Sequence, residues 1–287
     1  MKHRLQFLLI MIVTLPLVLM PLPIAQRIGA WFGGVLFNLL ENRRFTAIGN
    51  VAYVKEKGLI SDQRTPEQIA RDNYRNMGRV LIEIAFLCWG RGRSLTDQVV
   101  VEGIEHFDQA NARGKGIVSV TGHFGNWELN AIAHPALSGD VVGVARQQRN
   151  PYIDRAIVRS RTRYGGSTVY KEGAARTFLT ALKRGATVFI IMDEPFWRDK
   201  GITVDFLGQR AEFSKMAASL ANRTGAAVLP HAVIREGDRY VFRILPEITM
   251  SGDDEADTQR IVNFLEETVC SHPDQWLQWL RKWKWLR

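Results

Sequence analysis

The stretch 118–128 reads Val-Ser-Val-Thr-Gly-His-Phe-Gly-Asn-Trp-Glu, and it decides the fold that the chain is expected to adopt. Residues 117–121 are rich in β-branched side chains and predict a short buried strand, whereas from Asn126 the apolar spacing becomes helical until Pro135 ends it. His123 is therefore expected on the bend between a strand and a helix. In α/β folds, ligands bind at such bends at the carboxyl end of a sheet, beside backbone N–H groups that can face an anion.

The spacing of His123 and Glu128 suggests a mechanism. One imidazole nitrogen can face a substrate hydroxyl while the carboxylate holds the other nitrogen, provided that the chain turns between them, which Gly122 and Gly125 allow. Glu128 would then fix the tautomer of His123 and stabilise the imidazolium that forms when it takes the hydroxyl proton. The alternative is a histidine at a strand end with a helix carboxylate that only faces solvent.

The run 122–128 resembles the signature of the late acyltransferases of lipid A biosynthesis, and the resemblance covers roughly residues 20–285. These membrane-bound enzymes move a fatty acyl chain from acyl carrier protein to a hydroxyl. The resemblance implies a glycerolipid-acyltransferase-like fold, a membrane lipid acceptor and acyl carrier protein as the donor. It implies no metal and no cofactor, because the thioester is already activated.

Composition and charge narrow the partners. The chain has 287 residues, 46% of them hydrophobic, and carries a formal net charge of +9, which favours an anionic partner such as a membrane surface, a phosphorylated substrate or an acidic protein. Regular basic and aromatic residues on an exposed sheet, which would support nucleic-acid binding, are not found, so no nucleic acid is expected. Cys88 and Cys270 lack metal-ligand spacing and are expected to be reduced core residues.

The N-terminal segment is expected to contact a membrane. No charged residue lies between Arg4 and Arg27, and residues 5–22 are almost wholly apolar and about long enough to span a bilayer. Three prolines argue against one straight helix and favour a kinked or interfacial segment: Pro16, Pro21 and Pro23. A cleaved signal peptide is the alternative, but no small-residue cleavage site follows.

These features divide the chain into a membrane anchor or interfacial segment, residues 1–45, and an α/β acyltransferase domain, residues 46–287. The basic residues on both sides of the apolar segment favour the cytoplasmic face, so the expected location is the inner membrane with the catalytic domain on its cytoplasmic side. Trp31, Phe32 and Phe37 continue an apolar stripe that is suited to the interface.

The rest of the chain alternates short apolar strands with helical stretches. This alternation predicts an α/β fold with a mainly parallel central sheet flanked by helices. The strands are expected at 117–121, 141–145, 167–170, 187–192 and 227–233, extended by 204–206 and by 240–244, the last pairing across the Gly237-Asp238 turn. A long helix is expected over 65–89. Its residues 73–79 and Glu83 resemble the helix that precedes the catalytic core in the family, and we expect it to serve packing.

Arginines crowd the segment that follows the second of these strands, and three of them, Arg155, Arg159 and Arg163, share one helical face by their spacing of four. A solvated basic face is one explanation. Guanidinium groups also suit the phosphates of a sugar-lipid acceptor and the carboxylates of an acidic carrier protein.

The resemblance assigns roles to several residues around these elements. It implies that His123, Glu128, Asp193 and Arg161 are catalytic, with Asp193 a second acid at the end of the strand 187–192 and Arg161 a binder of an anionic group or of the developing oxyanion. Substrate binding is expected from four further residues, which are Asn126, Arg146, Arg149 and Asn150. The continuation Glu194-Pro195-Phe196 departs from the family pattern.

The tail from Ser271 predicts a helix with tryptophans on one face, 276, 279 and 283, and basic residues around it. Core packing and a membrane interface are both compatible with this stripe.

The sequence thus predicts an inner-membrane O-acyltransferase with His123 as general base. Two alternatives stay open: an acyltransferase for another glycolipid or a lysophospholipid, and a non-catalytic, membrane-tethered protein with a basic binding face.

Overall fold

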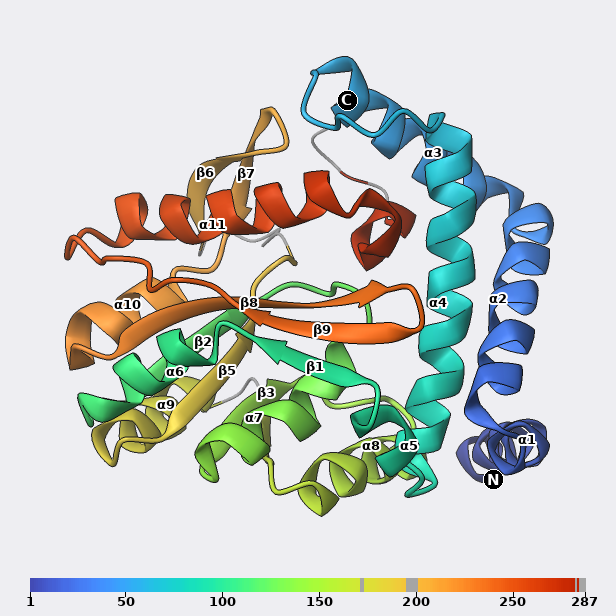
Figure 1. The fold of residues 1–287 in the computed structure, drawn as a ribbon, viewed down its shortest axis with the longest axis horizontal. Helices are drawn as coiled ribbons and strands as arrows, with labels where there is room; N and C mark the ends of the chain where they lie inside the picture. The colour runs from blue at the N-terminus through green and yellow to red at the C-terminus, as the bar shows by residue number, and fades with distance from the viewer. Residues whose placement is uncertain (171–172, 195–200, 282, 284–287) are drawn as a thin grey trace.

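A computed structural model describes residues 1–170, 173–194, 201–281 and 283. Its centre is a seven-stranded sheet with the order β1-β9-β8-β2-β5-β3-β4 (Figure 1). The strands are β1 (Val99–Glu102), β2 (Ile117–Thr121), β3 (Val141–Ala145), β4 (Ser167–Tyr170), β5 (Thr187–Ile191), β8 (Ala227–Glu236) and β9 (Arg239–Ile244). Neighbouring strands are parallel except β8 and β9, which form an antiparallel pair.

Helices cover both faces of this sheet, which is why its strands are apolar along most of their length. On one face α6 (Ile104–Ala112) and α7 (Asn130–Ser138) pack against Ile117 and Leu229. On the other face α9 (Ala174–Lys183), α10 (Met216–Thr224) and α11 (Asp254–Ser271) bury Val118 and Val120. The expected α/β fold with a mostly parallel sheet is therefore confirmed.

Two buried histidines, His134 and His231, lie next to Ser119 of β2 in the core of the domain. The hydroxyl of Ser119 lies 2.9 Å from Nδ1 of His231 and 3.2 Å from Nε2 of His134. His134 and His231 are 2% and 1% exposed, so both belong to the core under the sheet and are closed off from solvent.

The strands predicted at 117–121, 141–145, 167–170, 187–192, 227–233 and 240–244 all lie in the main sheet. The predictions differ from the structure at residues 204–206 and at β1. Residues 204–206 do not extend the main sheet but belong to β6 (Ile202–Phe206), which pairs with β7 (Gln209–Phe213) in a separate two-stranded sheet. A hairpin satisfies its backbone groups locally, and an apolar run alone does not reveal this. Strand β1 was not predicted, because its residues 100–102 are exposed and lack the pattern of a buried strand.

The prediction that Pro135 ends the helix after Asn126 is wrong. The chain forms a 3-10 turn, η1 (Trp127–Leu129), and then α7, which contains Pro135 and runs on to Ser138. A proline removes one hydrogen bond of the helix, and here the helix continues past it.

The N-terminal third is a layer of helices at one end of the sheet, visible at the right of Figure 1. It comprises α1 (Lys2–Leu19), α2 (Leu22–Leu39), α3 (Glu41–Glu56), α4 (Pro66–Cys88) and α5 (Arg93–Thr96). The apolar segment is broken between α1 and α2, as the prolines predicted. Among the described residues α1 alone is long and apolar enough to cross a membrane, and 6% of it is buried. A single helix of this kind near the N-terminus is a weak candidate for a membrane span, because a signal sequence has the same length and composition.

Helices α2 and α4 pack at close range through glycines. A Cβ atom built on Gly33 would lie 2.1 Å from the carbonyl oxygen of Tyr74, and one on Gly78 would lie 2.0 Å from that of Gly29. Such an approach of two helix backbones requires the absence of side chains. The start of α4 is a capping box, in which the side chains of Thr65 and Gln68 each bond the other's backbone N–H.

Candidate active site

The imidazole of His123 and the carboxylate of Asp193 meet at the carboxyl end of the sheet. β2 and β5 are parallel neighbours with Thr121 opposite Ile191, so His123 and Asp193 each follow their strand by two residues. Oδ1 of Asp193 lies 2.7 Å from Nδ1 of His123, and its Oδ2 accepts the backbone N–H of His123 at 2.7 Å. A carboxylate can only accept, so Nδ1 carries the proton and Nε2 is the basic nitrogen.

Electrostatics favour this arrangement as an ion pair once the imidazole gains a proton. Burial lowers the pKa of His123, but the charge and hydrogen bond of Asp193 more than offset this, so the pKa is raised above its usual 6.5. Burial conversely raises the pKa of Asp193, and the opposing effects of His123 and of the hydrogen bonds to the carboxylate leave it lowered. Asp193 is 0% exposed, so its carboxylate stays charged only because these donors surround it.

Two residues of the C-terminal segment complete this arrangement, and sequence reasoning did not find them. The indole Nε1 of Trp276 donates to Oδ2 of Asp193 at 2.8 Å, and the side-chain amide of Gln278 lies 3.2 Å from Nδ1 of His123. Both are 1% exposed. The tryptophan stripe was the available signal, but a periodic pattern does not reveal a partner 83 positions away.

The tail is not the single helix that the sequence predicted. It forms the short 3-10 turns η2 (Pro273–Gln275) and η3 (Leu277–Leu280). Of the two explanations for the tryptophan stripe, the structure supports core packing, since Trp276, Trp279 and Trp283 are 1%, 0% and 7% exposed. The last basic residues of the stripe, 282, 284 and 287, lie outside the described residues.

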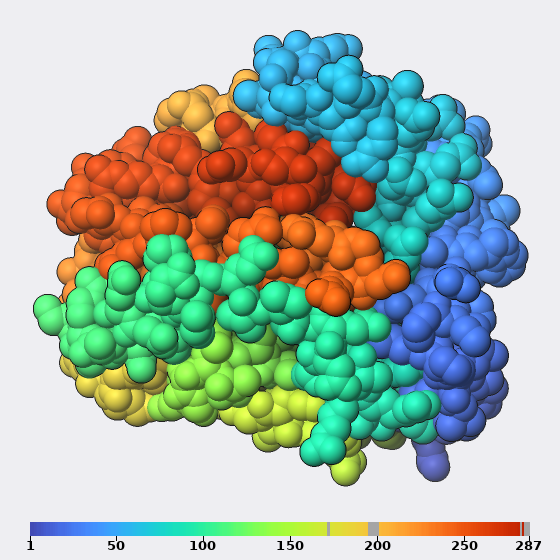
Figure 2. Space-filling model, in the orientation of Figure 1, coloured from blue at the N-terminus to red at the C-terminus, as the bar shows by residue number. Residues whose placement is uncertain are grey.

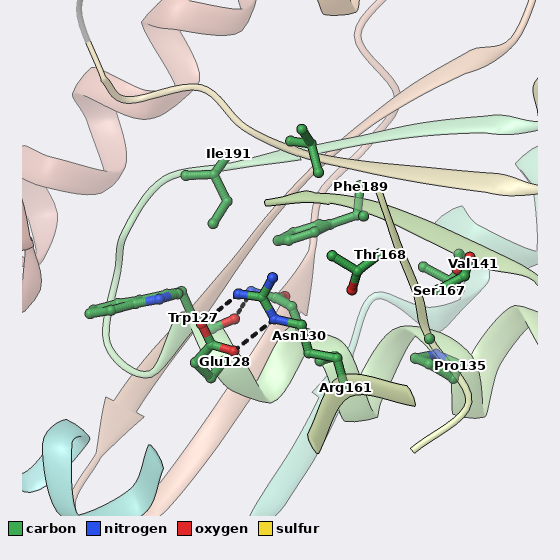
Figure 3. A pocket seen from close by; sticks show the side chains of 14 residues that line it. Trp127, Glu128, Asn130, Pro135, Val141, Arg161, Ser167, Thr168, Phe189 and Ile191 are labelled. Atoms are coloured by element: carbon green, nitrogen blue, oxygen red, sulfur yellow. Dashed lines mark hydrogen bonds and ion pairs between the residues drawn. The ribbon is translucent and has the colours of Figure 1, made fainter. Parts of the chain in front are cut away.

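Glu128 does not take the position that the sequence predicted. Its two carboxylate oxygens accept from Nη2 and Nε of Arg161 at 2.8 and 3.1 Å (Figure 3). Within the described part of the chain, the hydrogen-bond partner of the imidazole is instead Asp193. The expected contact of Glu128 with His123 is thus absent, because Glu128 lies within η1, from which its side chain points to Arg161 of α8 (Pro151–Arg163).

The same pair alters the expected role of Arg161. Burial lowers its pKa, but Glu128 more than compensates and the pKa is raised. The guanidinium is held in a bidentate ion pair, so its charge is already balanced before any substrate arrives.

His123, Glu128 and Arg161 line one cavity of about 490 Å³. Apolar side chains from α8, β5 and α10 form much of its wall, and Arg146 and Arg281 also border it: Ile157, Val158, Ile190, Met192 and Met216 are the main apolar members. A smaller cavity of about 40 Å³ continues behind the Glu128–Arg161 pair, between Trp127, Phe189 and Thr168 (Figure 3). The basic nitrogen therefore lies at a mainly apolar space with a polar rim.

Asn126 does not contact this cavity, although substrate binding was expected of it. It is 0% exposed, its amide donates to Glu83 at 2.8 Å, and its oxygen accepts the backbone N–H of Glu128 at 3.1 Å. The side chain therefore holds the loop between β2 and η1. Gly125 in this loop has φ +46° and a built Cβ would lie 2.1 Å from the oxygen of Val233, so a glycine is required there.

The partner of Asn126 belongs to what we call the Glu83 cluster: Gln26, Glu83, Asn126, Arg235 and Tyr240. Glu83 is fully buried and accepts from Gln26 of α2 at 2.7 Å, from Tyr240 of β9 at 2.5 Å and from Arg235 of β8. One carboxylate thus connects α2, α4, the end of the main sheet and the loop after His123. The sequence marked Glu83 only by resemblance and gave no sign of this role.

The remaining expected substrate-binding residues have different positions. Arg146 is exposed and borders the cavity, whereas Arg149 is exposed and does not line it. Asn150 is 6% exposed: its oxygen accepts the backbone N–H of Tyr152 at the start of α8, and its amide donates to the carbonyl of His3 at 2.8 Å. Asn150 caps a helix and fastens α1, which leaves no free group for a substrate.

The described residues contain no group of three or more His, Cys, Asp or Glu side chains placed to hold a metal ion. A basic imidazole nitrogen at a cavity, oriented by a buried carboxylate, is equipped to take a proton from a hydroxyl group. The fold and the site therefore define a candidate transferase or hydrolase that activates a hydroxyl.

Comparison with known proteins identifies the class more closely. Residues 1–285 match the family model for bacterial lipid A biosynthesis acyltransferases, and the chain belongs to this family. The resemblance drawn from the run 122–128 is thereby confirmed, and the chain is an acyltransferase.

The names of the similar proteins refer to two kinds of glycolipid. The chain is 27% identical to the phosphatidylinositol mannoside acyltransferase of Mycobacterium tuberculosis over 76% of its own length and 71% of the relative. It is 24% identical to the lipid A biosynthesis lauroyltransferase of Escherichia coli over 92% of its length and 86% of the relative. A lipid A biosynthesis acyltransferase of Haemophilus influenzae is 23% identical over 88% and 77%. The family supports acyl transfer to lipid A or a related glycolipid.

Proposed function

We propose that this protein transfers a fatty acyl chain from an acyl carrier protein thioester to a hydroxyl of a lipid A precursor, at the cytoplasmic face of the inner membrane. The observation that carries the proposal is the His123–Asp193 pair at the cavity. Nε2 of His123 takes the proton of the acceptor hydroxyl as its oxygen attacks the thioester carbonyl. The carbon–sulfur bond then breaks, and the imidazolium returns the proton to the leaving thiolate, so that no other reactant is needed.

Asp193 has the orienting role in this proposal that the sequence gave first to Glu128. It fixes the tautomer with Nε2 unprotonated, and its charge stabilises the imidazolium that forms during the attack. Trp276 and the backbone N–H of His123 hold the carboxylate in place. Glu128 and Arg161 then act as a neutral polar pair in the cavity wall beside the reacting groups.

The cavity supports a lipid substrate. Its apolar wall suits the acyl chain of the donor, and the exposed Arg146 at the rim suits the phosphate of a sugar-lipid acceptor or of the carrier protein's prosthetic arm. The net charge of +9 favours encounter with an acidic carrier protein and with an anionic membrane. The exposed apolar side chains of α1 support membrane association of residues 1–45, with residues 46–287 forming the acyltransferase domain.

A second acceptor, a mannosylated phospholipid, is a candidate because of the relative from Mycobacterium tuberculosis. The same proton transfer would serve it, since the hydroxyl is again the nucleophile. The distinction between the two acceptors lies in the rim and not in the His123–Asp193 pair.

The test uses the full chain purified in detergent, with acyl carrier protein thioester and either lipid A precursor or a mannosylated phospholipid. Mass spectrometry of the lipid product is the readout. We expect transfer to lipid A precursor, a fall of at least about a hundredfold in His123→Ala, and unchanged activity in His106→Ala, which alters a histidine on α6 outside the site. Normal turnover in His123→Ala would refute the mechanism. Turnover only with the mannosylated lipid would identify that lipid as the acceptor in place of the lipid A precursor. No turnover with either lipid would favour the alternative function, a non-catalytic, membrane-tethered binding protein.

A further inference from the structure

Helix α8 has two faces with different surroundings. Asp154, Ile157, Val158 and Arg161 point to the candidate catalytic cavity. The opposite face borders a groove of about 290 Å³ between α1, α4 and α8, lined among others by Phe7 and Met11 of α1 and by three arginines of α8: Arg155, Arg159 and Arg163. We call this groove the α1–α8 groove. It is separate from the space in which His123 lies.

The α1 wall of this groove is apolar and continues onto an exposed apolar surface. Phe7, Met11, Thr14 and Val18 recur at helical spacing and face the protein, with Phe7 stacked on Tyr152 at 5.8 Å. The other sides of α1 expose a set of large apolar side chains by 40–68%: Leu5, Leu8, Leu9, Ile10, Ile12, Val13, Leu15 and Leu19. Figure 2 shows these N-terminal residues in dark blue at the lower right edge of the molecule. Contiguous exposed apolar surface of this kind marks contact with a membrane or another molecule.

The arginine wall carries charge that no carboxylate among the described residues balances. Arg155, Arg159 and Arg163 are all exposed, and within the described residues no carboxylate pairs with any of them. The acid of the same helix, Asp154, is 8% exposed and accepts from Gln148 and Tyr170 on the other face. A row of three guanidinium groups, extending about 12 Å along the helix, is therefore available to anions from outside.

Helix α8 accompanies α1 over most of its length. Asn150, at the start of α8, bonds the carbonyl of His3 at 2.8 Å. At the other end, Arg163 lies against Gly90, and the residue before Gly90, Trp89, donates to Thr14 of α1 at 3.0 Å. If α1 entered the hydrocarbon layer upright, it would draw the arginines of α8 in with it, which is costly. With α1 along the interface, the apolar side chains meet acyl chains and the arginines meet the headgroup layer.

We propose that the α1–α8 groove binds an anionic phospholipid, with its phosphodiester on Arg155, Arg159 and Arg163 and an acyl chain against Phe7 and Met11. This site rests on the proposed membrane association but not on the reaction at His123. A soluble acidic protein would also balance the arginines, but it would leave the adjoining apolar side of α1 in water. A phospholipid satisfies both walls at once.

The test measures lipid retention by the full chain purified in detergent. The protein is incubated with mixed micelles of phosphatidylglycerol and phosphatidylcholine, and bound lipids are counted by native mass spectrometry. Wild type should prefer phosphatidylglycerol. In R155Q/R159Q/R163Q we expect the preference to fall about a hundredfold, because each basic side chain near anionic headgroups contributes about a fivefold effect. The control R176Q/R210Q/R223Q removes the same charge from α9, β7 and α10, and should keep the preference.

An unchanged preference in R155Q/R159Q/R163Q, or an equal loss in the control, would overturn the proposed site. A normal lipid preference combined with a raised KM for acyl carrier protein thioester would assign the arginines to the carrier protein instead, and would also overturn it. His123→Ala separates this proposal from the proposed reaction: it should lose turnover and retain phosphatidylglycerol like wild type.

Discussion

The packing of α2 on α4 predicts opposite effects of the same substitution at two adjacent glycines. At Gly33 a built Cβ lies 2.1 Å from the carbonyl oxygen of Tyr74, and at Gly34 the nearest atom is 3.7 Å away, in the flexible side chain of Arg75. Alanine at Gly33 therefore meets rigid backbone, whereas alanine at Gly34 meets ordinary van der Waals contact.

The magnitude follows from this geometry. Ordinary contact begins at 3.4 Å, so Gly33→Ala must separate the helices locally by 3.4 − 2.1 = 1.3 Å. Overpacking of this kind costs about 1–3 kcal/mol. Both variants share the gain of about 1 kcal/mol that alanine brings to a helix interior. We therefore expect Gly34→Ala to be neutral or stabilising, and Gly33→Ala to be less stable than Gly34→Ala by about 1–3 kcal/mol, or roughly 2–12 °C in Tm.

Thermal unfolding of the detergent-solubilised chain, followed by tryptophan fluorescence, measures this difference. Gly33→Ala should also lower acyl transfer, because α2 carries Gln26 to the Glu83 cluster at 2.7 Å. Gly49→Ala in α3, where nothing lies within 4 Å of a built Cβ, serves as a second control. Equal Tm values for Gly33→Ala and Gly34→Ala would refute the close approach of α2 and α4.

Two further predictions concern the site. Asp193→Asn should lower kcat by about 10²–10⁴, because the carboxylate no longer fixes the tautomer of His123 or stabilises its imidazolium. The general base must be neutral, so the activity of the wild type rises with pH through the raised pKa of His123. Without the charge of Asp193 that pKa falls, and the acidic limb of the pH–rate profile should move to lower pH in the variant. A profile that keeps its midpoint would exclude Asp193 as the source of that raised pKa. Glu83→Gln should destabilise the fold by about 3–5 kcal/mol, since Arg235, whose side chain is only 11% exposed, loses its counter-charge. Denaturant unfolding measures this, and a loss below about 1 kcal/mol would contradict the proposed importance of the Glu83 cluster.

Local patterns in the sequence predicted most of the strands of the main sheet. The strands at 117–121 and 141–145 are found with the predicted bounds, because they are short apolar runs between turns. The edge strand at 167–170 also has its predicted bounds, although it is partly exposed. The antiparallel pairing of β8 and β9 was also predicted, since Gly237-Asp238 supplies the turn. The separate hairpin of β6 and β7 escaped prediction, because its pairing depends on neighbours in space.

The site was predicted in part for the same reason. The bend that carries His123 is a local feature, and the arrival of Asp193 at the same edge follows from strand order, which the sequence suggested without fixing it. The partner of the imidazole depends on side-chain directions after the bend, where Glu128 turns to Arg161. Buried amides such as Asn126 look like binding residues in sequence, because nothing local shows that their groups are already bonded.

The hydrogen bond that the indole of Trp276 donates to Asp193 has a consequence for when, during synthesis of the chain, the site is complete. During synthesis from the N-terminus, the imidazole of His123 and the carboxylate of Asp193 can come together once β2 and β5 have paired. The indole that holds the carboxylate is made more than eighty residues after Asp193. A nascent chain that stops short of residue 276 would therefore contain both reactive groups yet leave the buried acid short of a donor, so that chemistry begins only after the rest of the domain has formed.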